Sequence, residues 1–235
     1  MDYGIVIEKI HQELKAYWGK GKVADYIPAL AEVEPKRYGI AIETLDGHSF
    51  QVGDADIRFS IQSISKVFAL AMVTRHLGDR IWKFVGREPS GNPFNSLVQL
   101  EYEHGIPRNP FINAGALVVT DRLMSLYEQP KDAILQFVRS ICGNDDIYYD
   151  KHIARSEREH ADRNMALGYL MKSFGNMEND VEDVVDVYCH QCAIAMSCKE
   201  LTRAFLFLAN HGVNPFNQEK ILTVSQSKRL GALML

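Results

Sequence analysis

Residues 57–73 read Ile57-Arg58-Phe59-Ser60-Ile61-Gln62-Ser63-Ile64-Ser65-Lys66-Val67-Phe68-Ala69-Leu70-Ala71-Met72-Val73. The short apolar segment 57–61 predicts a strand or turn, and the apolar run 67–73 predicts a buried helix. Ser63 and Lys66 lie between them, in the expected first turn of that helix. Because three residues span close to one helical turn, the amine of Lys66 can return to the hydroxyl of Ser63.

This pair has the chemistry of an activated nucleophile. A serine hydroxyl is a poor nucleophile unless a nearby base takes its proton. A buried lysine can be that base, since desolvation lowers its pKa and leaves more of the amine neutral. Backbone N–H groups at the start of the helix would point toward an oxyanion formed there. Ser-x-x-Lys also occurs by chance on ordinary helices, so the rest of the chain must decide.

The bulk properties describe an ordinary globular protein. The chain has 235 residues with 46% hydrophobic and 24% charged residues, enough for one large domain or two lobes. A net charge of −4 gives no electrostatic case for binding nucleic acid or an anionic membrane. The N-terminal segment resembles an amphipathic helix rather than a signal peptide, and no apolar run could span a bilayer. We therefore expect a cytoplasmic protein.

The four cysteines do not predict a metal site. Cys189-His190-Gln191-Cys192 has a spacing suited to metal or redox chemistry, but no second such pair completes four zinc ligands. The segment also has a helical pattern. We interpret Cys142, Cys189, Cys192 and Cys198 as free thiols that are small and buried or half-buried. No metal and no organic cofactor is expected.

Most of the chain after residue 63 has a helical pattern, whereas one clear hairpin precedes it. Residues 38–44 and 49–52 flank Asp46-Gly47, a strong hairpin turn. A first helix is indicated by Ile7, Ile10, Leu14 and Tyr17. Further helices are predicted near residues 64–77, 79–85, 111–126, 130–140, 160–173, 180–193 and 198–211.

The last residues suggest that the sheet is incomplete. Ser225 is a candidate N-cap for an apolar stripe of Leu230, Leu233 and Met234, after which the sequence stops at Leu235. A single two-stranded hairpin is a small sheet for a chain with so many predicted helices, because an isolated hairpin is only marginally stable. We expect further strands after residue 235, the alternative being a frayed terminal helix in an all-helical protein. The expected organisation is a single domain, with helix and hairpin in 1–62, a helical lobe in 63–215 and the start of a return to the sheet in 216–235.

Several further segments accompany Ser63 and Lys66 in a recognisable order. They are Gly21-Lys22-Val23-Ala24-Asp25-Tyr26-Ile27-Pro28-Ala29-Leu30, the segment 59–66, Val85-Gly86-Arg87-Glu88-Pro89-Ser90-Gly91-Asn92-Pro93-Phe94-Asn95-Ser96, Asn109-Pro110-Phe111-Ile112-Asn113-Ala114-Gly115-Ala116, Ser156-Glu157-Arg158-Glu159, Asp162-Arg163-Asn164, Tyr188 and Cys192. Together they resemble the serine-dependent glutaminases, over nearly the whole chain. The resemblance implies an α/β (α+β) fold of the β-lactamase/transpeptidase type, with a small antiparallel sheet and a large helical lobe.

The resemblance also implies an activity and a set of site residues. The activity is hydrolysis of L-glutamine to L-glutamate and ammonia, by a homo-oligomer (dimer or tetramer). Ser63 matches the nucleophile and Lys66 the catalytic lysine, and Tyr188 matches a residue that holds glutamine and can return a proton. The other matches are substrate-binding positions: Asn113, Glu157 and Asn164, with Tyr26 at the pocket edge. A Lys-Ser-Gly strand that the family carries near its C-terminus has no counterpart in residues 1–235.

These assignments fit the chemistry of glutamine, a zwitterion with an amide at its far end. Glu157 can pair with the ammonium group, and the amides of Asn113 and Asn164 can donate to the carboxylate. Because Glu157 and Asn164 are seven residues apart, one helix would show both on one face. The expected reaction passes through a glutamyl ester on Ser63.

Each residue also has a structural alternative, and the chain has alternative functions. The charge run around Glu157 is typical of a solvated helix face, Asn113 and Asn164 could cap helices, and Tyr188 and Tyr26 could be packing aromatics. The function could instead be that of a catalytically defective oligomerisation or regulatory partner. A third reading is a Ser-x-x-Lys enzyme acting on β-lactams or peptidoglycan, which fits poorly without an export signal.

Overall fold

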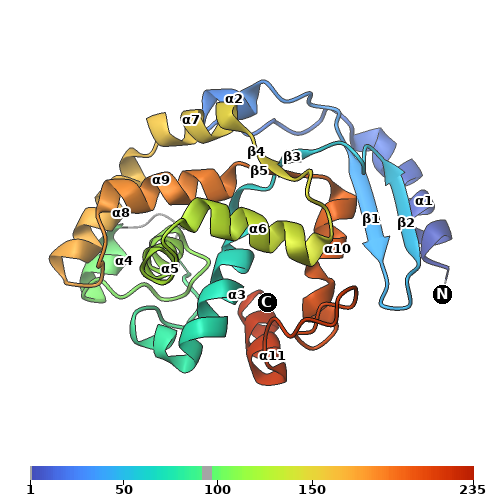
Figure 1. The fold of residues 1–235 in the computed structure, drawn as a ribbon. Coiled ribbons are helices and arrows are strands. Elements are labelled where there is room, and N and C mark those ends of the chain that lie inside the picture. Colours follow the sequence, from blue (N-terminus) through green and yellow to red (C-terminus); the bar gives the residue numbers. More distant parts are fainter. Residues whose placement is uncertain (1, 92–96) are drawn as a thin grey trace.

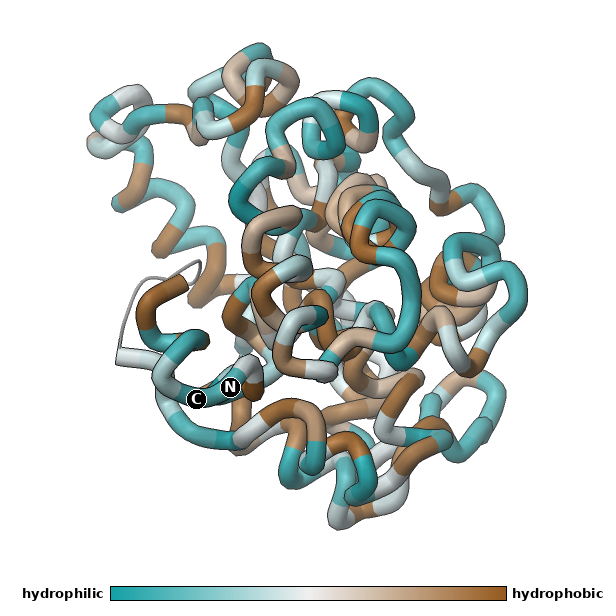
Figure 2. The backbone as a smooth tube through the Cα atoms, turned by 90° about the vertical axis from the view of Figure 1, so that its left-hand side faces the viewer, coloured by the Kyte–Doolittle hydropathy of each residue, from teal (hydrophilic) through white to brown (hydrophobic). Residues whose placement is uncertain are grey.

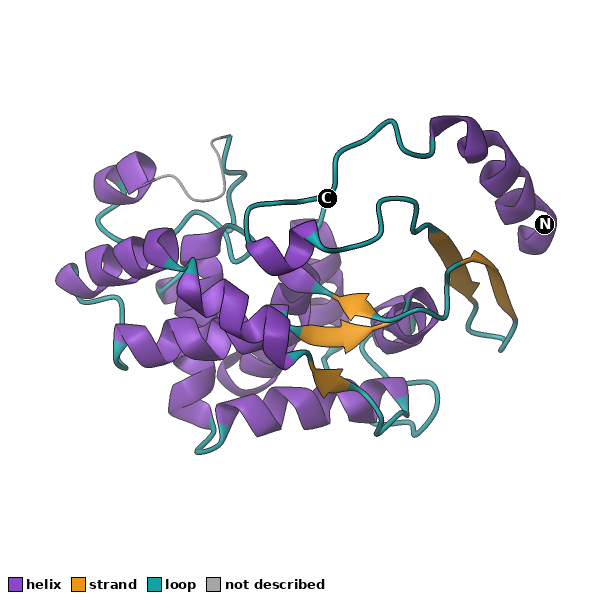
Figure 3. Cartoon of the chain, turned by 90° about the horizontal axis from the view of Figure 1, so that it is seen from above, coloured by secondary structure: helices purple, strands orange, loops and turns teal. Residues whose placement is uncertain are grey.

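The computed structural model describes residues 2–91 and 97–235, so residues 92–96 of the motif segment 85–96 lie outside the described residues. The chain forms a large helical lobe with a hairpin and the first helix at one end, as Figures 1 and 3 show. This arrangement confirms the predicted mixed α/β class, with small antiparallel sheets beside many helices.

The elements follow one another along the described chain in a mostly helical order. They are α1 (Tyr3–Leu14), η1 (Lys15–Tyr17), α2 (Pro28–Ala31), β1 (Gly39–Glu43), β2 (Ser49–Gly53), β3 (Phe59–Ser60), η2 (Gln62–Ile64), α3 (Ser65–Leu77), η3 (Gly78–Lys83), α4 (Leu97–Tyr102), α5 (Asn113–Leu126), α6 (Pro130–Cys142), β4 (Tyr148–Tyr149), α7 (Lys151–Glu159), α8 (Asp162–Ser173), α9 (Val181–Cys192), β5 (Ile194–Met196), α10 (Cys198–Ala209) and α11 (Val224–Leu233).

The predicted hairpin is confirmed. β1 and β2 pair antiparallel, from Gly39 opposite Gly53 to Glu43 opposite Ser49. Gly47 in the predicted turn has φ +89°, a backbone conformation that glycine adopts without steric cost. Helix α1 packs on β2 and helix α10 packs on β1, so both strands are tied to helices.

Of the second small sheet, only a strand or turn at 57–61, where β3 lies, was predicted from the sequence. This sheet has the strand order β3-β5-β4, and both pairings are antiparallel. Its strands are two or three residues long, too short to show an alternating pattern. Immediately after β3, the N–H of Ile61 donates to the carbonyl of Ile194 at 2.9 Å, which anchors the chain just before Ser63.

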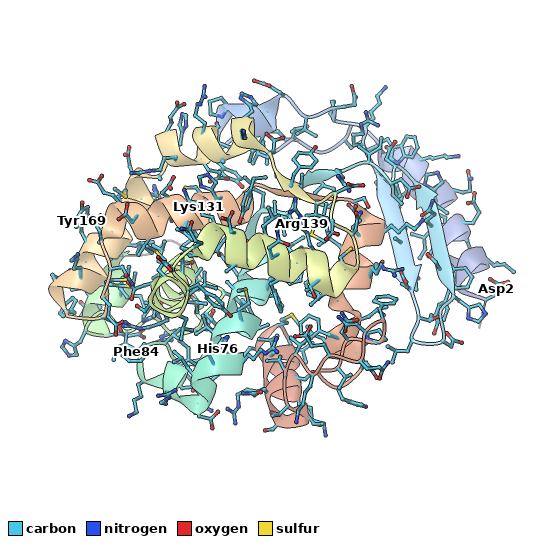
Figure 4. All side chains as sticks on the ribbon, in the orientation of Figure 1. Asp2, His76, Phe84, Lys131, Arg139 and Tyr169 are labelled. Atoms are coloured by element: carbon cyan, nitrogen blue, oxygen red, sulfur yellow. The ribbon has the colours of Figure 1, made fainter. Side chains whose placement is uncertain are left out.

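The helical lobe is built around α3 and α5, which pack on each other. The run 67–73 of α3 is buried throughout, as its composition predicted. Hydrophobic and hydrophilic residues alternate along most of the backbone, as the brown and teal segments of Figure 2 show. Polar contacts at the edge of α6 fix its neighbours: Lys131 forms an ion pair with Asp186 on α9, and Arg139 Nε donates to the carbonyl of Ile147 at 2.8 Å (Figure 4).

Several helix boundaries differ from the predictions. The segment predicted as a helix at 79–85 is the 3₁₀ helix η3, and α2, α4 and α7 were not predicted. Helix α11 is capped by Thr223 rather than Ser225, because Thr223 and Gln226 form a reciprocal capping box that satisfies two N–H groups. Leu230 from the predicted stripe is buried, while Met234 is exposed. Within the described residues, no helix combines the length and apolar character that crossing a bilayer requires.

Candidate active site

Ser63 lies in a tight turn between β3 and α3. Gln62, the residue before it, has φ +49°, in the left-handed region that costs a non-glycine residue conformational energy. Ser65 stabilises this turn: its backbone N–H bonds to the carbonyls of Gln62 and Ser63, and its buried hydroxyl donates to the Gln62 carbonyl at 2.7 Å. Ser63 itself is exposed. The turn therefore presents Ser63 outward at the start of a buried helix.

Lys66 is buried directly below this turn, with 4% of its surface exposed. Its Nζ donates to the Phe111 carbonyl at 3.0 Å and to Asn113 Oδ1 at 2.8 Å. Burial lowers the pKa of Lys66 from its usual value of 10.5 to about 8, because desolvation disfavours the ammonium form. A useful fraction of this amine is therefore neutral near neutral pH, as a general base requires.

The segment that leads into α5 places the Phe111 and Asn113 acceptors of Lys66. Asn109 Oδ1 accepts from the backbone N–H groups of Phe111 and Ile112, at 2.9 and 3.1 Å. The loop also lies close against α5, since a Cβ added to Gly115 would meet the Asn109 carbonyl at 1.9 Å. The Asn109-Pro110-Phe111-Ile112-Asn113 segment thus fixes the lysine from one side.

Tyr188 approaches the pair from α9 and is almost fully buried, with 3% exposed. Lys66 Nζ lies 5.9 Å from the centroid of its ring. Burial raises the pKa of Tyr188 well above its usual value, while hydrogen bonding to Ser63 acts in the opposite direction. Its hydroxyl is therefore a neutral group beside the Ser63 side chain.

Asn113 and Asn164 join each other on the far side of Lys66. Asn113 Nδ2 donates to Asn164 Oδ1 at 3.1 Å, and Asn113 Oδ1 faces the lysine. Glu157 and Asn164 lie on different helices, so the single helix that would show both on one face is not present. Glu157 lies in the last turn of α7 and Asn164 in the first turn of α8, because the helix is interrupted at His160 and Ala161. Asn164 reaches the site from the first turn of its own helix.

Glu157 is buried, with 8% exposed, although it lies in a charge run typical of a solvated helix face. Burial raises the pKa of its carboxyl group, and a hydrogen bond from Gln62 opposes the rise. Its Oε1 is a buried atom without a hydrogen-bond partner among the described residues. Since leaving a buried carboxylate oxygen unpaired costs free energy, this atom suits a cationic ligand group.

Gln62 is the site residue that sequence reasoning missed. Its Oε1 accepts from the Tyr26 hydroxyl at 3.1 Å, and its Nε2 donates to Ser60 Oγ at 3.1 Å. Tyr26 is 62% exposed, and its predicted position at a pocket edge stays a prediction. The only available signal for Gln62 was its place directly before Ser63. Its amide links Tyr26 to the neighbourhood of Glu157.

The surface beside the nucleophile is hollowed. A cavity of about 630 Å³ has Ser63, Lys66, Asn109 and Phe111 among its lining residues. A larger hollow of about 790 Å³ lies along Gly39, Asp54 and Ile153, but none of the predicted site residues lines it. Of these two hollows in the described part of the chain, the smaller is the one lined by Ser63 and Lys66, so we place the nucleophile and the base there.

The Cys189 and Cys192 pair lies in α9, and both thiols are free and buried. Across residues 2–91 and 97–235, no group of three or more His, Cys, Asp or Glu side chains is arranged to hold a metal ion. The structure brings the seven predicted site residues into one cluster around the turn at Ser63. What each one does there stays a prediction.

Known proteins with similar sequences and structures were found over the whole chain. The family model described as glutaminase matches residues 21–235. A glutaminase of Paraburkholderia phytofirmans is 57% identical over 235 residues, covering 100% of this chain and 77% of the relative. A glutaminase of Yersinia pestis is 55% identical over 231 residues, covering 98% of this chain and 75% of the relative.

Two solved structures show the same fold. The probable glutaminase of Bacillus subtilis superposes with a TM-score of 0.89 at 28% identity, covering 100% of this chain and 73% of that one. The probable glutaminase ybaS superposes with a TM-score of 0.86 at 31% identity, covering 97% and 76%. The predicted fold of the β-lactamase type is thereby confirmed.

Proposed function

This chain belongs to the glutaminase family, whose members hydrolyse L-glutamine to L-glutamate and ammonia, and we propose that Ser63, Lys66 and Tyr188 carry out that reaction here. The observation that carries the proposal is the combination of an exposed serine and a buried lysine with a lowered pKa in the same turn.

Acylation begins when the neutral amine of Lys66 takes the proton of Ser63. The Ser63 oxygen attacks the side-chain carboxamide carbon of glutamine and forms a tetrahedral oxyanion. Backbone N–H groups of the turn at Ser63 would stabilise this charge. The C–N bond then breaks, and ammonia leaves with a proton returned by Lys66 or Tyr188.

Deacylation uses water as the second nucleophile. The remaining glutamyl ester on Ser63 is attacked by a water molecule whose proton passes to Lys66. The ester C–O bond breaks, Ser63 recovers its proton and glutamate is released. No metal or organic cofactor has a role in these steps.

The ammonium and carboxylate groups of glutamine pair with side chains on α7 and α8, together with Tyr188 on α9 and Tyr26. Glu157 binds the ammonium group, since its buried Oε1 lacks a protein partner among the described residues. Asn164, supported by Asn113, and the hydroxyl groups of Tyr188 and Tyr26 donate to the carboxylate. Asn113 has a second part, because its Oδ1 also orients Lys66. The Asn113 amide therefore connects Asn164, which binds the substrate carboxylate, to Lys66, the base.

Ammonia release from glutamine, with glutamate measured in parallel, tests the proposal. We expect Ser63→Ala to abolish turnover while near-UV circular dichroism stays unchanged. A matched control is Ser60→Ala, because Ser60 is a neighbouring serine in β3 that contacts Gln62 and not the reacting atoms. Turnover retained in Ser63→Ala would remove Ser63 from the mechanism.

Two further properties complete the proposal. We place the protein in the cytoplasm, which is supported by its free thiols. We also expect a homo-oligomer, a dimer or tetramer, as implied by the family. Light scattering coupled to size-exclusion chromatography measures the mass directly, and a monomer at micromolar concentration would contradict this second property.

A further inference from the structure

Asn109 makes three hydrogen bonds through one side chain, in the segment that leads into α5. Its Oδ1 accepts from the backbone N–H groups of Phe111 and Ile112, at 2.9 and 3.1 Å. Its Nδ2 donates to the backbone carbonyl of Glu88 at 3.0 Å. Both ends of the amide therefore hold main-chain groups, and they belong to two segments of the chain, since Asn109 and Glu88 are 21 residues apart.

The Oδ1 end of Asn109 reaches Lys66 through a single peptide group, the one that joins Phe111 to Ile112. The N–H of this peptide, carried by Ile112, donates to Asn109 Oδ1 at 3.1 Å. Its C=O, carried by Phe111, accepts from Lys66 Nζ at 3.0 Å. Because a peptide group is planar and rigid, holding its N–H also fixes the direction of its C=O. Asn109 thereby aims the Phe111 carbonyl at the lysine amine.

The Nδ2 end of Asn109 holds one wall of the cavity beside the nucleophile. Residues 87–91 line that cavity together with Ser63. Within this wall, the N–H of Glu88 donates to the Arg108 carbonyl at 2.9 Å, and its own carbonyl accepts from Asn109 Nδ2 at 3.0 Å. Both backbone polar groups of Glu88 are thus bound to the segment that ends in Asn109, so one asparagine joins the wall to the acceptor of the base.

The direction of the lysine lone pair depends on these acceptors. A neutral amine has two N–H bonds and one lone pair. The Phe111 carbonyl and Asn113 Oδ1 lie 3.0 and 2.8 Å from Lys66 Nζ and can accept both N–H bonds. The lone pair then points in a third direction, where it can take the proton of Ser63. If the Phe111 carbonyl turned away, the amine could rotate about its bond to Cε and the lone pair would lose this direction.

We propose that Asn109 is a positioning residue with two separable effects: Oδ1 orients the base through the Phe111 carbonyl, and Nδ2 holds the 87–91 wall in place. The proposal rests on the roles of Ser63 and Lys66 given above. Loss of the Oδ1 contacts should slow the chemical step, because the amine is no longer aligned with the serine proton. Loss of the Nδ2 contact should weaken substrate binding, because the wall is held less firmly around the bound carboxamide.

Two substitutions of Asn109 separate these effects in steady-state kinetics with glutamine. Asn109→Ala removes both ends of the amide and should lower kcat about tenfold and raise KM about threefold. Asn109→Asp keeps an acceptor for the two backbone N–H groups but has no N–H for the Glu88 carbonyl. It should raise KM about threefold and keep kcat within about twofold. Rates are compared at pH 9, above the pKa of about 8 of Lys66, so that a modest rise in this pKa from the added charge changes kcat little.

The chain contains a matched control for this turn. Residues 214–216 have the same sequence, Asn-Pro-Phe, as residues 109–111, and Asn214 Oδ1 accepts from the Phe216 N–H at 3.0 Å. Asn214 is buried and is not among the residues that line the cavity beside Ser63. Asn214→Ala removes the same kind of turn contact and should lower the melting temperature at least as much as Asn109→Ala. Its kcat and KM should be unchanged.

Equal kcat in Asn109→Ala and Asn214→Ala would overturn the role of Oδ1, as would a kcat in Asn109→Asp as low as that in Asn109→Ala. An unchanged KM in Asn109→Asp would overturn the role of Nδ2. Where Asn109→Ala melts too low for assay, Asn109→Ser takes its place; its hydroxyl is a weaker acceptor, and a kcat about threefold lower is expected. Turnover by Ser63→Ala would instead overturn the proposed function, so the two failures are distinguishable.

Discussion

The Nζ of Lys66 donates to Oδ1 of Asn113 at 2.8 Å, and this bond fixes which way the asparagine amide faces. Asn113 Nδ2 then donates to Asn164 Oδ1 at 3.1 Å, so the base and the substrate-binding helix α8 share one amide. A carboxamide suits this position because it accepts from the lysine without adding a charge. A charged acceptor would favour the ammonium form of Lys66 and leave less neutral amine to take the Ser63 proton at neutral pH.

Replacing Asn113 with Asp tests that relationship. A carboxylate 2.8 Å from the amine should raise the pKa of Lys66 by about one unit or more, by favouring its charged form. The rising limb of the kcat/KM profile should therefore move to higher pH. Asn164→Asp is the control, because its contact with Lys66 runs through Asn113, and it should shift the limb less. An unmoved limb in Asn113→Asp would show that Asn113 does not tune the base.

The unaltered protein should show a rising pH dependence. Since the base must be neutral and its pKa lies at about 8, kcat/KM should increase with pH and level off above that value. Two units below, about one amine in a hundred is neutral, so activity should be about a hundredfold lower. Initial rates of ammonia release between pH 6 and 10 measure this. A flat profile across that range would contradict a lysine base.

Glu157→Gln should weaken binding and strengthen the fold. Loss of the anion that pairs with the substrate ammonium should raise KM about tenfold to a hundredfold. Because the folded pKa of Glu157 is raised, its unfolded state releases the proton at lower pH, and folding loses stability as pH rises through that interval. At pH 7 the variant should therefore melt at a higher temperature than the unaltered protein.

The stability gain in Glu157→Gln should shrink at pH 4, because most unfolded chains of the unaltered protein then also hold the Glu157 proton. Thermal unfolding followed by circular dichroism at both pH values measures the difference. A lower melting temperature for Glu157→Gln than for the unaltered protein at pH 7 would mean that other protein groups stabilise the buried carboxylate. It would then not be an unpaired site for a cationic ligand group.

Gln62→Gly separates the backbone role of Gln62 from its amide. Glycine adopts φ +49° freely, so the turn before Ser63 should persist and the melting temperature should not fall. The variant loses the links to Tyr26 and Ser60, so KM should rise about tenfold. Normal KM for glutamine in this variant would exclude the side chain from binding.

Local patterns made the hairpin and the Ser63 helix predictable. Asp46-Gly47 needs only its own turn chemistry, and the run 67–73 is apolar on every face because α3 is buried on every side. Features that depend on tertiary contacts were missed. β4 and β5 are two and three residues long, and their pairing joins segments about 45 residues apart.

In the candidate site, too, local features were predictable and tertiary ones were not. Ser63 and Lys66 are three residues apart in one turn, so their spacing alone predicted that they lie close together. Glu157 is buried because α7 packs against α9 and α2, which a charge run in the sequence cannot show. The break between α7 and α8 has no glycine or proline to mark it. Gln62 owes its positive φ to the turn that Ser65 stabilises, which sequence alone did not reveal.

Peptide mapping by mass spectrometry, after treatment with a diazoketone analogue of glutamine, tests most directly whether Ser63 is the nucleophile. We predict one covalent adduct on Ser63, formed faster at pH 9 than at pH 6 and blocked by excess glutamate. A protein that stays unmodified, or one labelled elsewhere while Ser63 remains intact, would contradict the mechanism.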